Sequence, residues 1–583
     1  MSHSLPSRAL LAAALTALLC GALPARAGEG AQPARSLIVK LRDAPEHARA
    51  KTASDGERVQ RVLTDAGLKT ARFRAFGRAA QHVDLGRRLD GADVARIAAR
   101  LRERPEVEWV VPNERERRLQ VPSDPLFAAG PNGSGQWWLF PAGGSNANDI
   151  EDRRRGVPGV QAAWSVDTGR TAVVVAVLDT GITAHPDLDA HVLPGYDFVS
   201  TIEYANDGDG WDADASDPGD GVSAADRSAN PTLFADCELD PSSWHGTAIA
   251  GMLAAVVDNG VGGAGIHWNA RVLPVRVAGK CGAEIADIVD GMRWAAGLQV
   301  WDDRQRPVPL NPSPARIVNI SFGGSAACNA AYQDTIDELR AHGVLVVAAA
   351  GNESGAVTRP ASCRGVLGVA ALNRDGFKST YSNFGPQVAI ATVGGDPRLL
   401  GAWGIALGDD GLLTTDNSGS QAPASPTYSR AFGTSFSAPL VAGVASLMLS
   451  VNPQLTVDQL LAGLQRSARP HVIAPHMSAC SAQNPGRCQC DTTTCGAGIL
   501  DAPQALLYAR DPINYRTSAL GAEVIDNADV DAAVASGLDR PSSIQTGATP
   551  ADSGGGALGA AWLLALAMAV ASLASNRARD RSR

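Results

Sequence analysis

The sequence lacks the clustered basic stripe that nucleic-acid-binding proteins carry. Its 60 Asp and Glu residues outnumber 51 Lys and Arg residues, for a formal net charge of -9. Nucleic acid is therefore excluded as an expected partner. The charge is also uneven, because residues 28–118 hold 20 basic against 14 acidic residues and residues 119–576 hold 25 against 45. Two oppositely charged parts of one chain are plausible partners for each other.

The apolar run near the N-terminus, Ala9–Leu23, is too short to span a bilayer comfortably. Arg8 precedes it and Ala25-Arg26-Ala27 follows. This charged, apolar and A-x-A order is that of a secretory signal peptide. We predict a signal peptide over residues 1–27, with Cys20 in the discarded part. The alternative is an amphipathic first helix.

The C-terminal segment, residues 553–583, has three parts in order. A glycine cluster, Gly554–Gly556, is followed by the apolar run Ala557–Ala574 and by four arginines, Arg577, Arg579, Arg581 and Arg583. Apolar length with a basic flank predicts a membrane helix oriented by the positive-inside rule. The order also resembles the GlyGly-type sorting signals of Gram-negative bacteria, which a rhombosortase cuts near the glycines. A permanent membrane anchor is the alternative.

Eight cysteines remain once Cys20 is removed. An even number in an exported chain predicts disulfides. We favour Cys237 with Cys281, Cys328 with Cys363, and two bridges within the last cluster, which is Cys480, Cys488, Cys490 and Cys495. The spacing of that cluster also suits a zinc knot, although an oxidising compartment favours bridges.

Two folded parts follow the leader. Residues 28–120 contain the strand-like SLIVKL, HVDL and VEWVVP and the helix-like ADVARIAARLRER, which predicts a small α+β module of ferredoxin-like type. Residues 121–512 alternate β-branched runs with helix-length segments: TAVVVAVLDTG, ARVLPVRV, RIVNISFGG and HGVLVVAAAGN. Such runs predict an α/β fold with a parallel sheet covered by helices on both faces. Residues 513–552 are assigned to a linker.

Four polar residues stand at the ends of predicted elements in the larger part: Asp179, His245, Asn352 and Ser435. Each alone has an ordinary interpretation as a turn or capping residue. Together they supply what acyl transfer to water needs. The histidine activates the serine hydroxyl, the carboxylate orients the histidine, and the amide meets the charge that develops on the carbonyl oxygen.

The blocks around these residues resemble the signatures of the subtilase family of serine proteases. They are DTG at Asp179, HGT at His245, AAAGN at Asn352 and GTSFSAP at Ser435, in the subtilisin order. The resemblance covers about Gln120 to Arg510 and implies a subtilisin-like fold that acts on proteins and peptides. It also implies that the preceding module is an inhibitory, chaperoning propeptide and thus a partner of the enzyme.

The resemblance assigns roles to residues of this chain. Asp179 orients His245, His245 is the general base and then acid, and Ser435 is the nucleophile. The Asn352 side chain and the Ser435 N–H form the oxyanion hole. The SFGG stretch resembles the edge segment that pairs with the substrate main chain, and with two later residues it is implied to line the S1 pocket. The set is Ser321, Phe322, Gly323, Gly324, Ala350 and Gly351.

Two positions depart from the usual family pattern. Phe436 replaces the methionine that follows the nucleophile, and Ala248 replaces a histidine three residues after His245. Neither position carries a triad role, and the loss of the methionine removes an oxidation liability. The stretch after Ser435 predicts a buried helix that begins about Pro439, with Ser437 left as a capping residue.

A structural calcium site is a further implication of the resemblance. VVDNGVGGAG is similar in length and spacing to the calcium loop of thermitase-like subtilases. The implied ligands are two carboxylates, one amide and three main-chain carbonyls: Asp124, Asp187, Asn259, Val256, Val261 and Gly263. An ordinary solvated turn is the alternative. A second acidic loop, Asn206–Asp220, lacks the spacing and final glutamate of an EF-hand, so a second calcium site and a solvated loop both remain open.

We therefore expect an exported serine endopeptidase of the EC 3.4.21 class, made as a zymogen and stabilised by Ca²⁺, with no organic cofactor. It is expected to be secreted or at the cell surface after transient retention in the inner membrane. The rival hypothesis is a catalytically silent surface-binding protein on the same fold.

Overall fold

The computed structural model describes two compact units, which meet in sequence at Arg118 and Leu119. The described residues are 34–42, 55–68, 72–76, 80–89, 91–113, 121–128, 135–143, 154–398, 407–475, 477–517 and 521–525. The predicted signal peptide, most of the linker and the C-terminal segment lie outside them.

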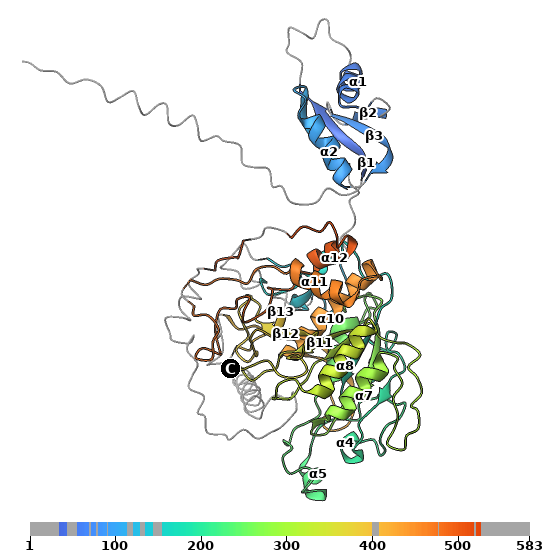
Figure 1. The fold of residues 1–583 in the computed structure, drawn as a ribbon, viewed down its shortest axis with the longest axis vertical. Coiled ribbons are helices and arrows are strands. Elements are labelled where there is room, and N and C mark those ends of the chain that lie inside the picture. The colour runs from blue at the N-terminus through green and yellow to red at the C-terminus, as the bar shows by residue number, and fades with distance from the viewer. Residues whose placement is uncertain are drawn as a thin grey trace, which may run out of the picture. The chain divides into compact units, whose positions relative to one another are not determined.

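The N-terminal unit is a four-stranded antiparallel sheet, in the order β2-β3-β1-β4, with two helices (Figure 1). Its core is formed by side chains such as Leu37, Val83 and Leu101. The sequence alone did not indicate the first helix and the second strand. The elements are β1 (Ala34–Leu41), α1 (Asp55–Asp65), β2 (Arg72–Phe76), β3 (Ala80–Leu89), α2 (Gly91–Arg102) and β4 (Val107–Pro112).

The larger unit contains a seven-stranded parallel sheet in the order β13-β12-β11-β10-β5-β7-β6. Its strands are β5 (Val174–Asp179), β6 (Tyr196–Asp197), β7 (Arg271–Arg276), β10 (Ile317–Ile320), β11 (Leu345–Ala349), β12 (Leu367–Leu372) and β13 (Val388–Val393). The four β-branched runs form four of these strands, which confirms the predicted α/β class.

Helices cover both faces of this sheet (Figure 1). Alternate residues of β5 point to opposite faces. Val175 and Val177 pack in one core with α6 (His245–Ala254) and α10 (Thr434–Val451). Ala176 and Leu178 pack in a second core with α7 (Ile285–Ala295) and α8 (Ala330–Ala341). Both faces are therefore apolar, which produces the continuous runs. Two further helices are α11 (Val457–Ser467) and α12 (Ala502–Arg510).

Shorter elements complete the unit. They are η2 (Trp137–Leu139), α3 (Val160–Ala163), α4 (Ile202–Ala205), α5 (Ala224–Ala229), the hairpin of β8 (Ala278–Gly279) with β9 (Gly282–Ala283), and the hairpin of β14 (Leu412–Asn417) with β15 (Pro426–Ala431).

Helix α10 differs from the sequence prediction at its start. It begins at Thr434, so Pro439 lies inside the helix, and no side chain caps its N-terminus. The Ser437 hydroxyl bonds instead to the carbonyls of Thr392 and Val393 at the end of β13. The capping role predicted for Ser437 is therefore wrong, because its partner comes from the sheet. Although α10 is long and apolar enough to cross a membrane, it is 94% buried and is a core helix.

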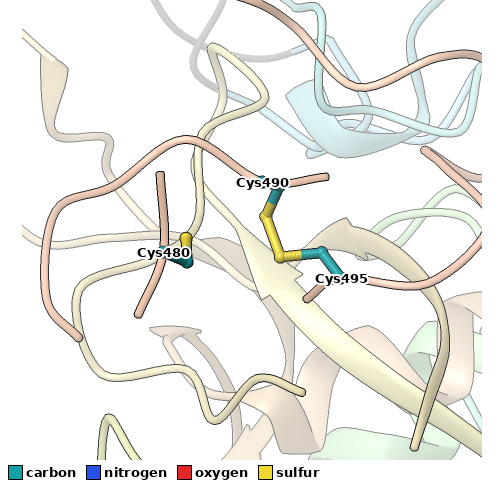
Figure 2. A group of neighbouring side chains, drawn as sticks. All are labelled: Cys480, Cys490 and Cys495. Carbon is teal, nitrogen blue, oxygen red and sulfur yellow. A yellow bond between two sulfur atoms is a disulfide. The ribbon is translucent and has the colours of Figure 1, made fainter. Parts of the chain in front are cut away.

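Four disulfides join the eight cysteines as the sequence favoured. They are Cys237–Cys281, Cys328–Cys363, Cys480–Cys488 and Cys490–Cys495. Figure 2 shows Cys480 beside the bridge between Cys490 and Cys495. The three sulfur atoms lie within 4.8 Å of one another, but each is already bonded to another sulfur. No thiolate is left in this cluster to bind zinc.

Candidate active site

Asp179 and His245 meet at the carboxyl edge of the sheet. Asp179 ends β5 and is almost fully buried, while His245 opens α6. The imidazole Nδ1 lies 2.8 Å from one carboxylate oxygen of Asp179 and 3.0 Å from the other. Gly246 permits this approach, because a Cβ there would lie 2.1 Å from the carbonyl oxygen of Gly181. The carboxylate thus fixes the orientation of the ring.

The electrostatics of His245 favour its charged form. Burial of the ring lowers its pKa, but the charge and hydrogen bond of Asp179, with smaller contributions from Asp220 and Asp217, raise the pKa above its usual value overall. The other ring nitrogen, Nε2, is buried and has no hydrogen-bond partner among the described residues. It is therefore free to accept a proton from a hydroxyl group that turns toward it.

Ser435 lies in the first turn of α10. Its hydroxyl donates to the main-chain oxygen of Ser321 at 2.6 Å rather than to His245. The Ser435 carbonyl in turn accepts a hydrogen bond from the Ser321 hydroxyl at 2.9 Å. Pro439 explains why this carbonyl is available, since a proline cannot donate the helical N–H bond to the residue four positions earlier.

Asn352 follows β11 and is held from the start of α10. Its amide oxygen accepts hydrogen bonds from the Thr434 N–H and hydroxyl, both at 2.9 Å. With its oxygen occupied by Thr434, the amide keeps its NH₂ group as a hydrogen-bond donor. Thr434 has a function that sequence reasoning missed, although it lies within the GTSFSAP block.

The two departures from the family pattern are both buried. The Phe436 ring packs edge-on against the imidazole of His245, with ring centroids 5.6 Å apart. Ala248 lies in α6 as part of the apolar core. These contacts show the start of α10 beside the start of α6.

Two of the predicted substrate-binding residues, Ser321 and Gly351, contact the first turn of α10. Ser321 bonds to Ser435 directly, and the Gly351 N–H donates to Thr434 at 3.2 Å. Gly351 has a φ of +106°, and a Cβ there would lie 2.3 Å from the Asn383 side chain, so glycine is required.

The other predicted substrate-binding residues are placed by the elements beside them in the chain. Ala350 continues from β11 and accepts hydrogen bonds from Thr358. Phe322 and Gly323 connect Ser321 to Gly324, whose N–H donates to the Arg359 carbonyl at 3.1 Å. The Gly324 N–H is therefore already hydrogen-bonded to this chain and is not available to a substrate main chain.

The predicted calcium ligands also come together. The N–H groups of Asp258 and Asn259 donate to the Asp124 carboxylate, and the Gly263 N–H and the Asn259 amide donate to Asp187. The Val256 N–H bonds to the Asp187 carbonyl, and the Val261 N–H bonds to the Asn259 amide oxygen. All six residues are thus adjacent, although these bonds involve N–H groups of the valines and glycine rather than their carbonyls.

The donor chemistry of this group fits calcium. Asp124 and Asp187 are both buried, and burial raises the pKa of each carboxyl group, with the charge of Asp124 adding to the effect on Asp187. Among the described residues neither carboxylate forms an ion pair with Lys or Arg. A hard cation would balance these charges. The Asn259 side-chain amide would have to flip by about 180°, exchanging its NH₂ group and its oxygen, to present the oxygen to that cation.

Three aspartates of the acidic loop Asn206–Asp220 have partners elsewhere in the described chain. Asp207 pairs with Arg276, Asp217 bonds to Thr180, and Asp220 bonds to Ser243, each at a separate point of the chain. Sequence reasoning singled out the density of aspartates but assigned them no structural partners.

Comparison with known proteins agrees with this geometry. The profile of the Subtilase family matches residues 170–498. The extracellular protease of Xanthomonas campestris pv. campestris is 35% identical over 85% of this chain and 78% of its own length. The extracellular basic protease of Dichelobacter nodosus is 35% identical over 71% of this chain and 62% of its own. A solved protease structure from Pseudoalteromonas arctica has a TM-score of 0.54 and 39% identity, and covers 67% of this chain and 100% of its own.

The matched region contains the parallel sheet and all four polar residues at its carboxyl edge. The chain belongs to the Subtilase family and is a subtilisin-like serine endopeptidase.

Proposed function

We propose that this chain is an exported zymogen of a calcium-stabilised endopeptidase that cuts proteins with an Asp179–His245–Ser435 triad. The observation that carries the proposal is the hydrogen bond between Asp179 and His245, because it orients an imidazole whose other nitrogen is buried and has no hydrogen-bond partner in the part of the chain that the structure describes. Such a nitrogen is suited to act as a general base.

The reaction begins with a rotation of the Ser435 side chain. Its hydroxyl leaves the Ser321 carbonyl and turns to Nε2 of His245, which removes the proton as the oxygen attacks the substrate carbonyl carbon. His245 then gives this proton to the leaving amine as the peptide bond breaks. Water attacks the acyl enzyme in the same way and releases the acid. Asp179 stabilises the imidazolium in both steps.

Two hydrogen-bond donors would stabilise the negative charge on the oxygen of the tetrahedral intermediate. They are the NH₂ group of Asn352, whose oxygen is held by Thr434, and the Ser435 N–H in the first turn of α10. The first N–H groups of a helix have no helical partner, and the helix dipole favours negative charge there. These donors are fixed before the reaction, which is the source of their effect.

The substrate class is protein or peptide. An extended chain would pair with the main chain of Phe322 and Gly323, as a strand added beside the segment that ends at the Gly324–Arg359 bridge. Ala350 and Gly351 would line the pocket for the side chain that precedes the cut bond.

Calcium would be held by Asp124, Asp187 and Asn259 with main-chain oxygens of Val256, Val261 and Gly263. Its role would be structural: it would neutralise the two buried carboxylates and join the segment around Asp124 to the loop that follows α6.

Export and maturation complete the proposal. Residues 1–27 would be removed as a signal peptide, residues 28–120 would be the inhibitory propeptide, and residues 553–583 would hold the chain in the membrane until a rhombosortase-type peptidase cuts it. The names of the relatives, which include two extracellular proteases, support secretion. The separate N-terminal unit supports a propeptide.

A fluorophosphonate probe tests the proposal against the rival silent binding protein. The processed protein should be labelled at Ser435 and should cleave casein, whereas the Ser435→Ala variant should do neither. Wild-type protein that is folded and processed but shows neither labelling nor cleavage would refute the enzymatic function. N-terminal sequencing of the secreted form would identify the propeptide boundary.

A further inference from the structure

The acidic loop Asn206–Asp220 contacts Thr180, which follows Asp179, and Ser243, which lies two residues before His245. We propose that Asp217 and Asp220 are positioning residues of the catalytic Asp179–His245 pair, because they hold Thr180 and Ser243 in place. This inference rests on the proposed triad and assigns the loop a role in the reaction.

The first contact joins the loop to the end of β5 and the start of α6. Asp217 is 2% exposed, and one of its carboxylate oxygens accepts a hydrogen bond from the Thr180 hydroxyl at 2.6 Å. The same hydroxyl oxygen accepts a bond from the Gly246 N–H at 3.1 Å. Thr180 follows Asp179 and Gly246 follows His245. The chain of bonds from Asp217 therefore ties together the two main-chain segments that carry the pair.

The second contact fixes the segment that leads into α6. The two carboxylate oxygens of Asp220 accept hydrogen bonds from the N–H and the hydroxyl of Ser243, each at 2.6 Å. The Ser243 hydroxyl oxygen in turn accepts a bond from the His245 N–H at 3.3 Å. Between them, Trp244 has a φ of +50° and provides no side-chain cap for the helix. Asp220 thus fixes the segment before α6, whose N-terminus has no side-chain cap of its own.

The loop is itself held firmly against the sheet. Gly181 has a φ of +100°, and a Cβ there would lie 2.8 Å from the Ala215 carbonyl oxygen and 2.9 Å from the Asp217 nitrogen. Arg276, which ends β7, forms an ion pair with Asp207 at 2.6 Å. A loop anchored at both ends can position its neighbours, whereas a solvated loop cannot.

The charges in this region also act on His245. Asp179 faces the ring from β5, Asp217 and Asp220 face it from the acidic loop, and the apolar Phe436 ring covers it from α10. All three carboxylates raise the pKa of His245. The loop therefore favours the imidazolium that forms during the reaction as well as the geometry of the pair.

The test uses four variants of the full chain and one matched control. Asp217→Ala and Asp220→Ala remove the carboxylates, Thr180→Val removes the hydroxyl with little change in shape, and Thr180→Ser restores a hydroxyl. The control is Asp209→Ala, which removes an exposed carboxylate from the same loop. The concentration of active sites is determined by titration with a fluorophosphonate. For each variant, kcat and KM are then measured with a peptide substrate, and kcat is calculated per active site.

We expect kcat to fall by about 10- to 100-fold in the first three variants, with KM within about twofold of wild type, as for a small misplacement of reacting groups. Thr180→Ser and Asp209→Ala should retain the wild-type kcat. The rate of fluorophosphonate labelling should fall in parallel with kcat, because labelling also needs His245 to activate Ser435.

Different failures have different meanings. An active wild type together with unchanged kcat per active site in Asp220→Ala and Thr180→Val would overturn the inference and leave the proposed function intact. A lower melting temperature with unchanged kcat per active site would also overturn it, because it would show a role in stability alone. A wild type that neither labels nor cleaves would refute the proposed function and the inference together. If Asp217→Ala fails to fold, the isosteric Thr180→Val variant decides.

Discussion

Ser321 and Ser435 exchange two hydrogen bonds: each serine hydroxyl donates to the main-chain carbonyl of the other, at 2.9 and 2.6 Å. The pair joins the end of β10 to the first turn of α10. One bond compensates for the N–H that Pro439 cannot donate inside the helix. In the other, the hydroxyl of the proposed nucleophile donates to the Ser321 carbonyl rather than to His245.

The Ser321 hydroxyl should therefore be needed for both stability and rate. In Ser321→Ala, the buried Ser435 carbonyl loses its donor, and we expect the free energy of unfolding to fall by about 1–3 kcal/mol. The kcat should fall as well, because the first turn of α10 is less firmly held. Denaturant unfolding of the inhibitor-blocked enzyme and peptide hydrolysis measure the two effects.

Ser325→Ala is the matched control for that substitution, since Ser325 is an exposed serine of the same segment. It should leave both quantities unchanged. Equal stability of the two variants would show that the Ser435 carbonyl does not depend on Ser321.

The Asn352 amide should contribute mainly to the transition state. Asn352→Leu keeps the approximate shape but removes the NH₂ donor, and kcat should fall by about 10²- to 10³-fold with little change in KM. Thr434→Val should cause a smaller loss, because the amide remains but its oxygen loses one of two donors. Thr434→Ser should restore the rate, and a large increase in KM for Asn352→Leu would contradict a role confined to the transition state.

The pH dependence of activity should reflect His245. The ring must be neutral to accept the proton of Ser435, and its pKa is raised above the usual value. Activity should therefore fall as the pH drops, with a midpoint above about 6.5. Asp179→Asn removes the main charge that raises the pKa, so the midpoint should move to lower pH while kcat falls by about 10⁴-fold. Profiles of kcat/KM against pH measure this, and an unmoved midpoint would contradict the assignment.

Removal of calcium should destabilise the enzyme. If Asp124 and Asp187 bind the ion, calcium at 100 times its Kd should add about 2.7 kcal/mol to the free energy of unfolding. Chelation with EDTA should lower the Tm, and added Ca²⁺ should restore it. Asp187→Asn should abolish this response, whereas Asp189→Asn, at an exposed position in the same loop, should retain it. A calcium response that survives in Asp187→Asn would place the ion elsewhere.

Phe436 should protect the enzyme from oxidants. A methionine at this position would lie beside Ser435 and against His245, where conversion to the sulfoxide would place a polar group next to the reacting atoms. Hydrogen peroxide should therefore inactivate Phe436→Met much faster than wild type, as followed by residual peptide hydrolysis. Phe436→Leu controls for loss of the ring and should remain resistant. Equal inactivation of wild type and Phe436→Met would contradict this explanation.

Sequence patterns predicted the α/β class, four strands of the sheet, the pairs Cys237–Cys281 and Cys328–Cys363, and the four family blocks, but they left open how the last four cysteines pair. The strands were predictable because β-branched runs buried on both faces are local patterns. The cysteines and the family blocks were predictable because they are short and distinctive in the sequence. The folded structure was needed to show where α10 begins, which groups Ser437 and Thr434 bond to, and that the acidic loop contacts Thr180 and Ser243. Hydrogen bonds between segments far apart in the chain leave no periodic signal, because one aspartate in a loop looks the same whether it meets water or a catalytic strand.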